Sequence, residues 1–277
     1  MDAAQSPRPV AFPGFWTAVG MTYLACWSQY AWSAVLGRWL PASAALGLAL
    51  VLTFLLMAAL ALSSVGPDWR FRFGLAPFSR RFVPAIVLVV PVCLVTLGLQ
   101  AAIISTLARG RSLGVWEWHG PVLSSSSDLG LLTGLFVVVV LMPVSLEIFF
   151  RGLMQQGLVA RLGVRWGVLA ASVFYAAAVA GVHTDVKTFS AVFWSTLVAG
   201  IVFGIMRQAS GSLWAPAAAH VATSAVHAIL KLAATVAPIP CISTPGRFVP
   251  APIVGIAAAC TAAGLGLVVW AARRPAD

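Results

Sequence analysis

Two stretches of this 277-residue sequence place charged or imidazole groups inside otherwise apolar runs. In the first, Glu147 and Arg151 stand four positions apart in Val-Ser-Leu-Glu-Ile-Phe-Phe-Arg-Gly, and Gln155 follows four positions later. Residues at i and i+4 share a face of an α-helix, so the acid and the base are expected to pair. The pair is either a structural ion pair that pins one helix or part of a site in which the carboxylate takes up a proton.

The second stretch is a polar stripe formed by His220, Ser224, His227 and Lys231. Their spacing of i, i+4, i+7 and i+11 places all four within about 40° of one another on a helix that is otherwise Ala, Val, Ile and Leu. Polar side chains in a lipid-buried helix normally face the interior of a bundle or a hydrated cavity. The stripe therefore predicts an internal cavity, with His220 as the first candidate for chemistry.

His183 is the third candidate and lies at the end of the fifth expected span. If the chain turns near Gly163, Glu147 lies about 24 Å from the turn, level with Ala178 and Ala180 on the returning helix. His183 is then about 5 Å farther out, which is one helical turn. That position fits both a site residue and a plain histidine at the membrane interface.

The composition identifies the solvent of these helices as lipid. Hydrophobic residues make up 61% of the chain and charged residues only 9%, with a mean hydropathy of +0.97. Such a chain cannot cover the surface of a soluble globular domain. The 17 Lys and Arg against 7 Asp and Glu give a net charge of +10, but the basic residues lie between apolar runs. That distribution favours membrane topology and anionic headgroups over nucleic acid.

We therefore predict an all-α polytopic membrane protein, with residues 1–277 forming a single integral membrane domain of about eight transmembrane helices. Residues 1–14 are expected to form a polar tail, and the chemistry-bearing core covers about 129–236. The longest outer connection, 109–128, carries Trp116 and Trp118, and it either lies at the membrane interface or is a surface loop anchored by these aromatics. The expected spans cover residues 15–36, 42–62, 83–107, 129–158, 166–182, 189–206, 215–236 and 251–272.

The most basic loop fixes the expected orientation. Arg70, Arg72, Arg80 and Arg81 stand there against Asp68 alone. Positively charged loops remain in the cytoplasm, so this loop is predicted to be cytoplasmic. With eight crossings, both termini are then cytoplasmic as well.

The polar blocks resemble the motifs of the CAAX prenyl protease and bacteriocin-processing (CPBP) family of intramembrane endopeptidases. The resemblance covers about residues 141–227. The family motif Glu-Glu-x-x-Phe-Arg-Gly is similar to the segment from Leu146 to Gly152, and the block Gly-Ser-Leu-Trp-Ala-Pro leads to His220 and Ser224. The resemblance implies a CAAX-protease-like helical bundle in a bacterial inner membrane and an intramembrane endopeptidase that acts on a membrane-associated peptide or protein.

Three positions depart from the family pattern. Leu146 replaces the first glutamate, which the family is thought to use to activate water. Phe174 matches the second block, but its expected histidine partner is Ala178, which leaves His183 as the substitute. Ser224 stands where the family has Asn or Asp.

If the chain is a glutamate-dependent protease, hydrolysis needs a base, a polarised carbonyl and a proton donor for the leaving amine. We expect Glu147 as the base and His220, helped by His183 or His227, as oxyanion stabiliser or acid. Arg151 and Ser224 are the supporting residues.

We expect no cofactor or metal, because one carboxylate and separated histidines form no recognised zinc spacing. The alternative function is a catalytically silent member that binds a peptide or partner protein as an immunity or assembly factor. A proton-coupled transporter is a third possibility, but the sequence lacks paired broken helices.

Overall fold

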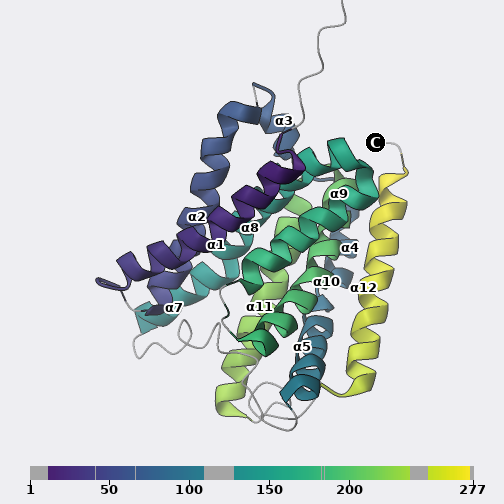
Figure 1. Ribbon diagram of the computed structural model, residues 1–277. Helices are drawn as coiled ribbons and strands as arrows, with labels where there is room; N and C mark the ends of the chain where they lie inside the picture. The colour runs from purple at the N-terminus through teal and green to yellow at the C-terminus, as the bar shows by residue number, and fades with distance from the viewer. Residues whose placement is uncertain are drawn as a thin grey trace, which may run out of the picture.

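The computed structural model describes residues 12–40, 42–65, 67–108, 128–181, 183, 185–237 and 249–274, and all regular structure in these residues is helical. The helices form one bundle (Figure 1). Their bounds are α1 (Phe15–Leu36), α2 (Ala42–Val65), α3 (Trp69–Phe73), η1 (Arg80–Phe82), α4 (Val83–Val89), α5 (Val92–Ala108), α7 (Asp128–Phe136), η2 (Val137–Leu141), α8 (Met142–Glu147), η3 (Ile148–Met154), α9 (Gln155–Ala180), α10 (Val186–Ser210), α11 (Trp214–Val236) and α12 (Ala251–Ala272).

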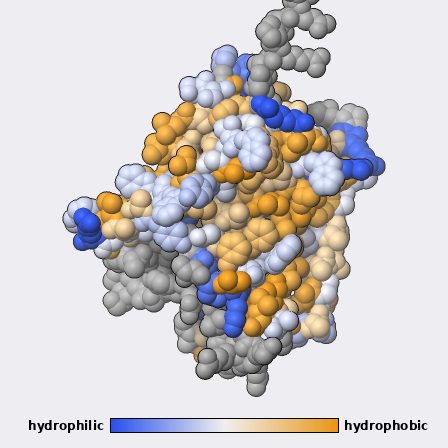
Figure 2. Space-filling model, in the orientation of Figure 1, coloured by the Kyte–Doolittle hydropathy of each residue, from blue (hydrophilic) through white to orange (hydrophobic). Residues whose placement is uncertain are grey.

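The bundle is an integral membrane fold, as the composition predicts. Figure 2 shows apolar side chains over the middle of one face and hydrophilic residues toward its ends. Within the described part of the chain, six stretches are long and apolar enough to cross a bilayer. They are Gly47–Val65, Arg80–Leu107, Gly130–Ala180, Val186–Ser210, Trp214–Ala234 and Ala251–Ala272.

Two of the expected crossings need comment, the long stretch Gly130–Ala180 and the first helix, α1. The stretch Gly130–Ala180 has 51 residues, more than twice the length of one span, and bends back on itself at Gly163. The first expected span, α1, is a helix of 22 residues but is not one of the apolar stretches. Its exposed Trp16, Tyr23 and Trp27 lower its hydropathy, so a first crossing there remains a prediction.

The turn near Gly163 occurs where the sequence predicts it. Gly163 has φ 77° and ψ 168°, a backbone conformation that side-chain-bearing residues rarely adopt. Beyond the turn, Gly167 lies so close to Val159 that a Cβ on it would be 2.5 Å from the Val159 Cα atom. The two halves of the hairpin thus pack backbone against backbone, and the second half of α9 returns alongside η3.

The helix that carries the first polar block is interrupted on both sides of α8. Pro143 has no N–H for an intrahelical bond, and its ring clashes with the preceding turn. The chain accommodates it by the π-helical η2 directly before α8. A second π-helical segment, η3, follows Glu147, and the N–H of Gln155 bonds to the Phe150 carbonyl five residues back.

The basic loop and the two ends of the described chain lie at the same end of the bundle. Figure 1 shows α1 beginning and α12 ending at the end where α3 lies. Arg81 donates from Nη1 to the Arg274 carbonyl at 3.1 Å, which ties the basic loop to the end of α12. The expected side of the membrane for this end remains a prediction. The expected tail, up to residue 11, and the long outer connection at 109–127 lie outside the described residues.

Candidate active site

The two polar stretches meet inside the bundle. Glu147, at the end of α8, is fully buried, and its Oε1 lies 2.8 Å from Nδ1 of His220 on α11. The two residues are 73 positions apart in sequence and belong to two different spans. The structure therefore brings together the carboxylate and the imidazole that the sequence singles out.

Arg151 supplies the positive charge beside this carboxylate. Its Nη1 lies 3.4 Å from Glu147 Oε1, and its Nη2 donates to the Gly200 carbonyl of α10 at 3.1 Å. The guanidinium carbon lies 4.2 Å from the centroid of the Tyr175 ring, a cation–π distance. Arg151 is only 1% exposed, and these contacts replace part of its hydration. Its Nη1 and the Oε2 of Glu147 are buried without a hydrogen-bond partner among the described residues. Arg151 places a positive charge beside Glu147 and links α8 and η3 to α9 and α10.

The His220 ring is fixed on both faces and at one nitrogen. It stacks on Phe203 with a centroid distance of 4.7 Å and an interplanar angle of 24°, and it meets Tyr175 edge-on. In the neutral tautomer that carries its proton on Nδ1, the imidazole donates to Oε1 of Glu147. Nε2 is then the free acceptor, and none of the described residues bonds to it.

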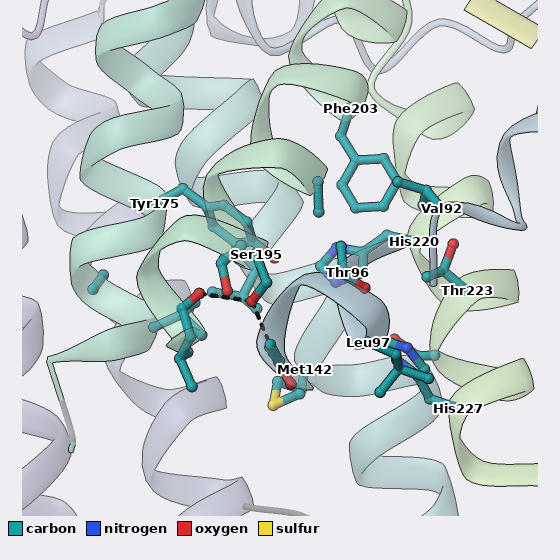
Figure 3. Close-up of a pocket in the computed structure, with 18 of the residues that line it drawn as sticks. Val92, Thr96, Leu97, Met142, Tyr175, Ser195, Phe203, His220, Thr223 and His227 are labelled. Atoms are coloured by element: carbon teal, nitrogen blue, oxygen red, sulfur yellow. Dashed lines mark hydrogen bonds between the residues drawn. The ribbon is translucent and has the colours of Figure 1, made fainter. Parts of the chain in front are cut away.

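A cavity of about 150 Å³ opens beside His220, among α2, α5, α8, α9, α10 and α11. That volume holds several water molecules, and the wall offers enough polar groups to bond them. Figure 3 shows His220 and His227 of α11, Thr96 of α5 and Ser195 of α10 arranged around it. The predicted internal cavity is thus present.

Most predicted site residues line this cavity, but two do not. His183, His220, Ser224 and His227 all belong to its wall. Glu147 lies behind His220 and is not part of the lining, nor is Arg151. Lys231, the last member of the stripe, is also outside the wall.

The residues that depart from the family pattern occupy prominent positions in the same wall. Leu146 and Ala178, at the places of the family's first glutamate and of its second-block histidine, both line the cavity and are buried. Ser224 lines it beside His220. The described wall therefore contains imidazoles and hydroxyls but no carboxylate.

A further polar pair in the wall is not among the sequence candidates. Gln100 of α5 donates from Nε2 to Oγ of Ser195 on α10 at 2.8 Å, and Ser195 in turn donates to the Val192 carbonyl. The sequence did contain a signal for Gln100, because it is an amide within the apolar run 83–107. Ser195 carries no such signal, since a serine in a membrane helix commonly bonds to its own backbone.

His183 lies in the connection between α9 and α10 and lines the cavity. Partial burial lowers the pKa of His183, and the nearby Asp185 carboxylate opposes that shift. Asp185 caps α10 by accepting the backbone N–H groups of Lys187 and Thr188 at 3.0 and 3.1 Å. Bonds from Thr188 and Lys187 lower the pKa of Asp185, so the cap is an ionised carboxylate at neutral pH.

Metal ligands do not cluster in this part of the chain. No three His, Cys, Asp or Glu side chains of the described residues converge as a metal site would require.

Fold and site together define an all-helical integral membrane protein with a Glu–Arg–His cluster beside a cavity lined by both polar and apolar side chains. Residues 128–226, from α7 into α11, match the family described as type II CAAX prenyl endopeptidase, Rce1-like. The match includes Glu147, Arg151, His183, His220 and Ser224. The resemblance to CPBP endopeptidases is thereby confirmed. Comparison with curated proteins and with solved structures gave no match.

Proposed function

We propose that this protein is an intramembrane endopeptidase that hydrolyses a membrane-associated peptide in the cavity beside His220. The observation that carries the proposal is the 2.8 Å contact between Glu147 Oε1 and His220 Nδ1, at the wall of a cavity large enough for water. The match to a family described as prenyl endopeptidases supports the reaction class.

In the proposed reaction His220 takes the role of the base. Nε2 accepts a proton from a water molecule in the cavity while the water oxygen attacks the peptide carbonyl carbon. The carbonyl electrons move to oxygen, and the Ser224 hydroxyl is available to donate a hydrogen bond to that oxyanion. When the intermediate collapses, the C–N bond breaks and the proton on Nε2 passes to the leaving amine.

Glu147 acts in this scheme through His220 and not on the substrate. Its full burial behind the imidazole leaves no place for a peptide against its carboxylate. A carboxylate that accepts from Nδ1–H fixes the tautomer with Nε2 free and stabilises the imidazolium that forms. Glu147 is therefore a positioning residue, in contrast to the role of base expected from the sequence.

The test is cleavage of a farnesylated peptide ending in Cys-aliphatic-aliphatic-X by the purified protein in detergent or nanodiscs. His220→Ala is expected to lower kcat by about 10²–10⁴ through loss of the base. Glu147→Gln is expected to lower kcat about tenfold or more while KM stays within about twofold, because only the orientation and charge behind the imidazole change. Asp68→Asn removes an exposed carboxylate and is the matched control.

The outcomes separate the roles. Undiminished turnover in both His220→Ala and Glu147→Gln would remove the peptidase proposal. A loss of melting temperature that fully accounts for the Glu147→Gln effect would make Glu147 a structural residue only.

The second candidate is a catalytically silent protein that captures a peptide in the same cavity. Leu146 and Ala178 favour it, because they leave the wall without the carboxylate and the second-block histidine of the family. This candidate predicts that the wild type retains the farnesylated peptide without releasing product and that His220→Ala retains it equally well. Photocrosslinking of the peptide, followed by mass spectrometry of the peptide itself, distinguishes capture from cleavage.

A further inference from the structure

A second cavity, separate from the first, lies at the end of the bundle that carries the basic loop. It has a volume of about 580 Å³ and is enclosed by α3, η3, the start of α9 and the end of α10. Its polar lining comes from Arg72, Gln156, Arg207 and Gln208, and no Asp or Glu belongs to its described wall.

Arg207 is a buried cation at this cavity. It is 4% exposed, and its Nη2 donates to the Arg72 backbone carbonyl at 3.1 Å. Its Nε atom is buried without a hydrogen-bond partner, and no carboxylate of the described residues forms an ion pair with it. A buried charge is unfavourable unless an opposite charge compensates it. Within the described part of the chain, this guanidinium thus has no anionic partner.

The backbone beside Arg207 is shaped to admit it. Gly74 has φ 68°, in the left-handed region, and a Cβ there would lie 2.5 Å from Arg207 Nη2 and 2.6 Å from its Cζ. Any other residue at position 74 would therefore collide with the guanidinium. Glycine ends α3 and keeps the charged group at the cavity wall at the same time.

The remaining polar groups extend the same donor set. Arg72 is a second, half-buried cation in the wall. The Nε2 of Gln208 is buried and has no hydrogen-bond partner among the described residues. Two guanidiniums and an amide N–H₂ in a described wall that contains no Asp or Glu offer donors to an anion with several acceptor oxygens, and Arg recognises phosphate through such forked contacts.

The position of the cavity favours a lipid as the source of that anion. The apolar stretches Gly47–Val65 and Val186–Ser210 both end at this cavity. Phe71 in its wall is 89% exposed and stands between Arg70 and Arg72, a pattern typical of the headgroup region. We propose that this cavity binds the phosphate group of an anionic membrane lipid, held by Arg207 and Arg72 with Gln208 as an additional donor.

The proposal is tested by native mass spectrometry of the delipidated full-length protein in detergent, titrated with phosphatidylglycerol, phosphatidylcholine or inorganic phosphate. The wild type is expected to bind one phosphatidylglycerol at least about tenfold more tightly than phosphatidylcholine. Arg207→Gln is expected to weaken phosphatidylglycerol binding about tenfold or more, because a charge-assisted contact is lost. Arg80→Gln, an exposed arginine of the same loop outside the cavity, changes the net charge equally and is expected to stay within about twofold.

Equal affinity of wild type and Arg207→Gln for phosphatidylglycerol would overturn the proposal. Inorganic phosphate that binds as tightly as the lipid and displaces it would overturn the lipid source. If Arg207→Gln does not fold, Arg72→Gln and Gln208→Glu decide, the second by placing a competing carboxylate in the cavity. Both are expected to lose phosphatidylglycerol, and unchanged binding in both contradicts the site.

Discussion

At the scale of the residue, the cavity wall lacks two groups of the family motifs, a glutamate at position 146 and a histidine at position 178. Leu146 and Ala178 line the cavity beside His220, so side chains introduced there reach the same space. We predict that Leu146→Glu combined with Ala178→His raises cleavage of the farnesylated peptide at least about tenfold over the wild type. The physical reason is that an additional base enters the wall beside the bound water.

The matched control is Leu146→Gln combined with Ala178→His, which has nearly the same shape but no carboxylate. Equal turnover in the two double variants would show that a carboxylate at position 146 has no part in the reaction. Comparison of melting temperatures in the same detergent separates loss of fold from loss of chemistry.

The residues of the site differ in how far the sequence foretold them. Glu147, Arg151 and His220 stand out because an ionisable group inside an apolar helix is costly, and the structure brings all three together. The same reasoning did not reveal that Glu147 lies behind the imidazole. The periodicity of an α-helix shows which face carries a residue, but not how far that residue lies from the cavity. Ser195 was not predicted, because only its hydrogen bond with Gln100, 95 positions away in sequence, distinguishes it from other serines of membrane helices.

At the scale of the element, the hairpin around Gly163 sets the height of Glu147 relative to α9. Gly167 permits the close approach, since a Cβ there would meet the Val159 backbone at 2.5 and 2.6 Å. We predict that Gly167→Ala destabilises the protein by about 1–3 kcal/mol through overpacking. Unfolding in detergent micelles, followed by circular dichroism, measures the change.

Gly266→Ala in α12 is the control for this prediction, because nothing lies within 4 Å of a Cβ at that position. Alanine has the higher helix propensity, so this variant is expected to be neutral or more stable by up to about 1 kcal/mol. Two variants with the same stability would contradict the packing argument.

The helices themselves were largely predictable, and the exceptions have identifiable causes. Expected spans and observed helices agree closely for α1, α11 and α12, and in α11 and α12 length and hydrophobicity suffice. The expected span at 83–107 is divided at Pro91, between α4 and α5. The π-helical segments η2 and η3 carry no periodic signal in so apolar a sequence.

At the scale of the whole molecule, the arrangement of the ends bears on orientation. The start of α1, the end of α12 and the basic loop lie at one end of the bundle (Figure 1). We predict from the arginines of that loop that this end faces the cytoplasm. Fusions of green fluorescent protein and of alkaline phosphatase to either terminus, expressed in a bacterium, measure the side.

Both terminal fusions are expected to fluoresce and to lack phosphatase activity. An alkaline phosphatase inserted next to Asp185, in the connection between α9 and α10, is expected to be active and serves as the positive control. Active phosphatase at either terminus would contradict the predicted orientation.

The π-helical segment η3 has a consequence for variation in chain length. A π-turn accommodates one residue more than the α-helical ladder requires, so deletion of a single residue within Ile148–Met154 leaves a segment that is able to close as regular α-helix. The flanking helices would then remain continuous and nearly in phase, because the π-turn already contains the residue that is removed. Glu147 would keep its direction toward α11, whereas the same deletion within the regular helix α9 would rotate the two sides by about 100° relative to each other.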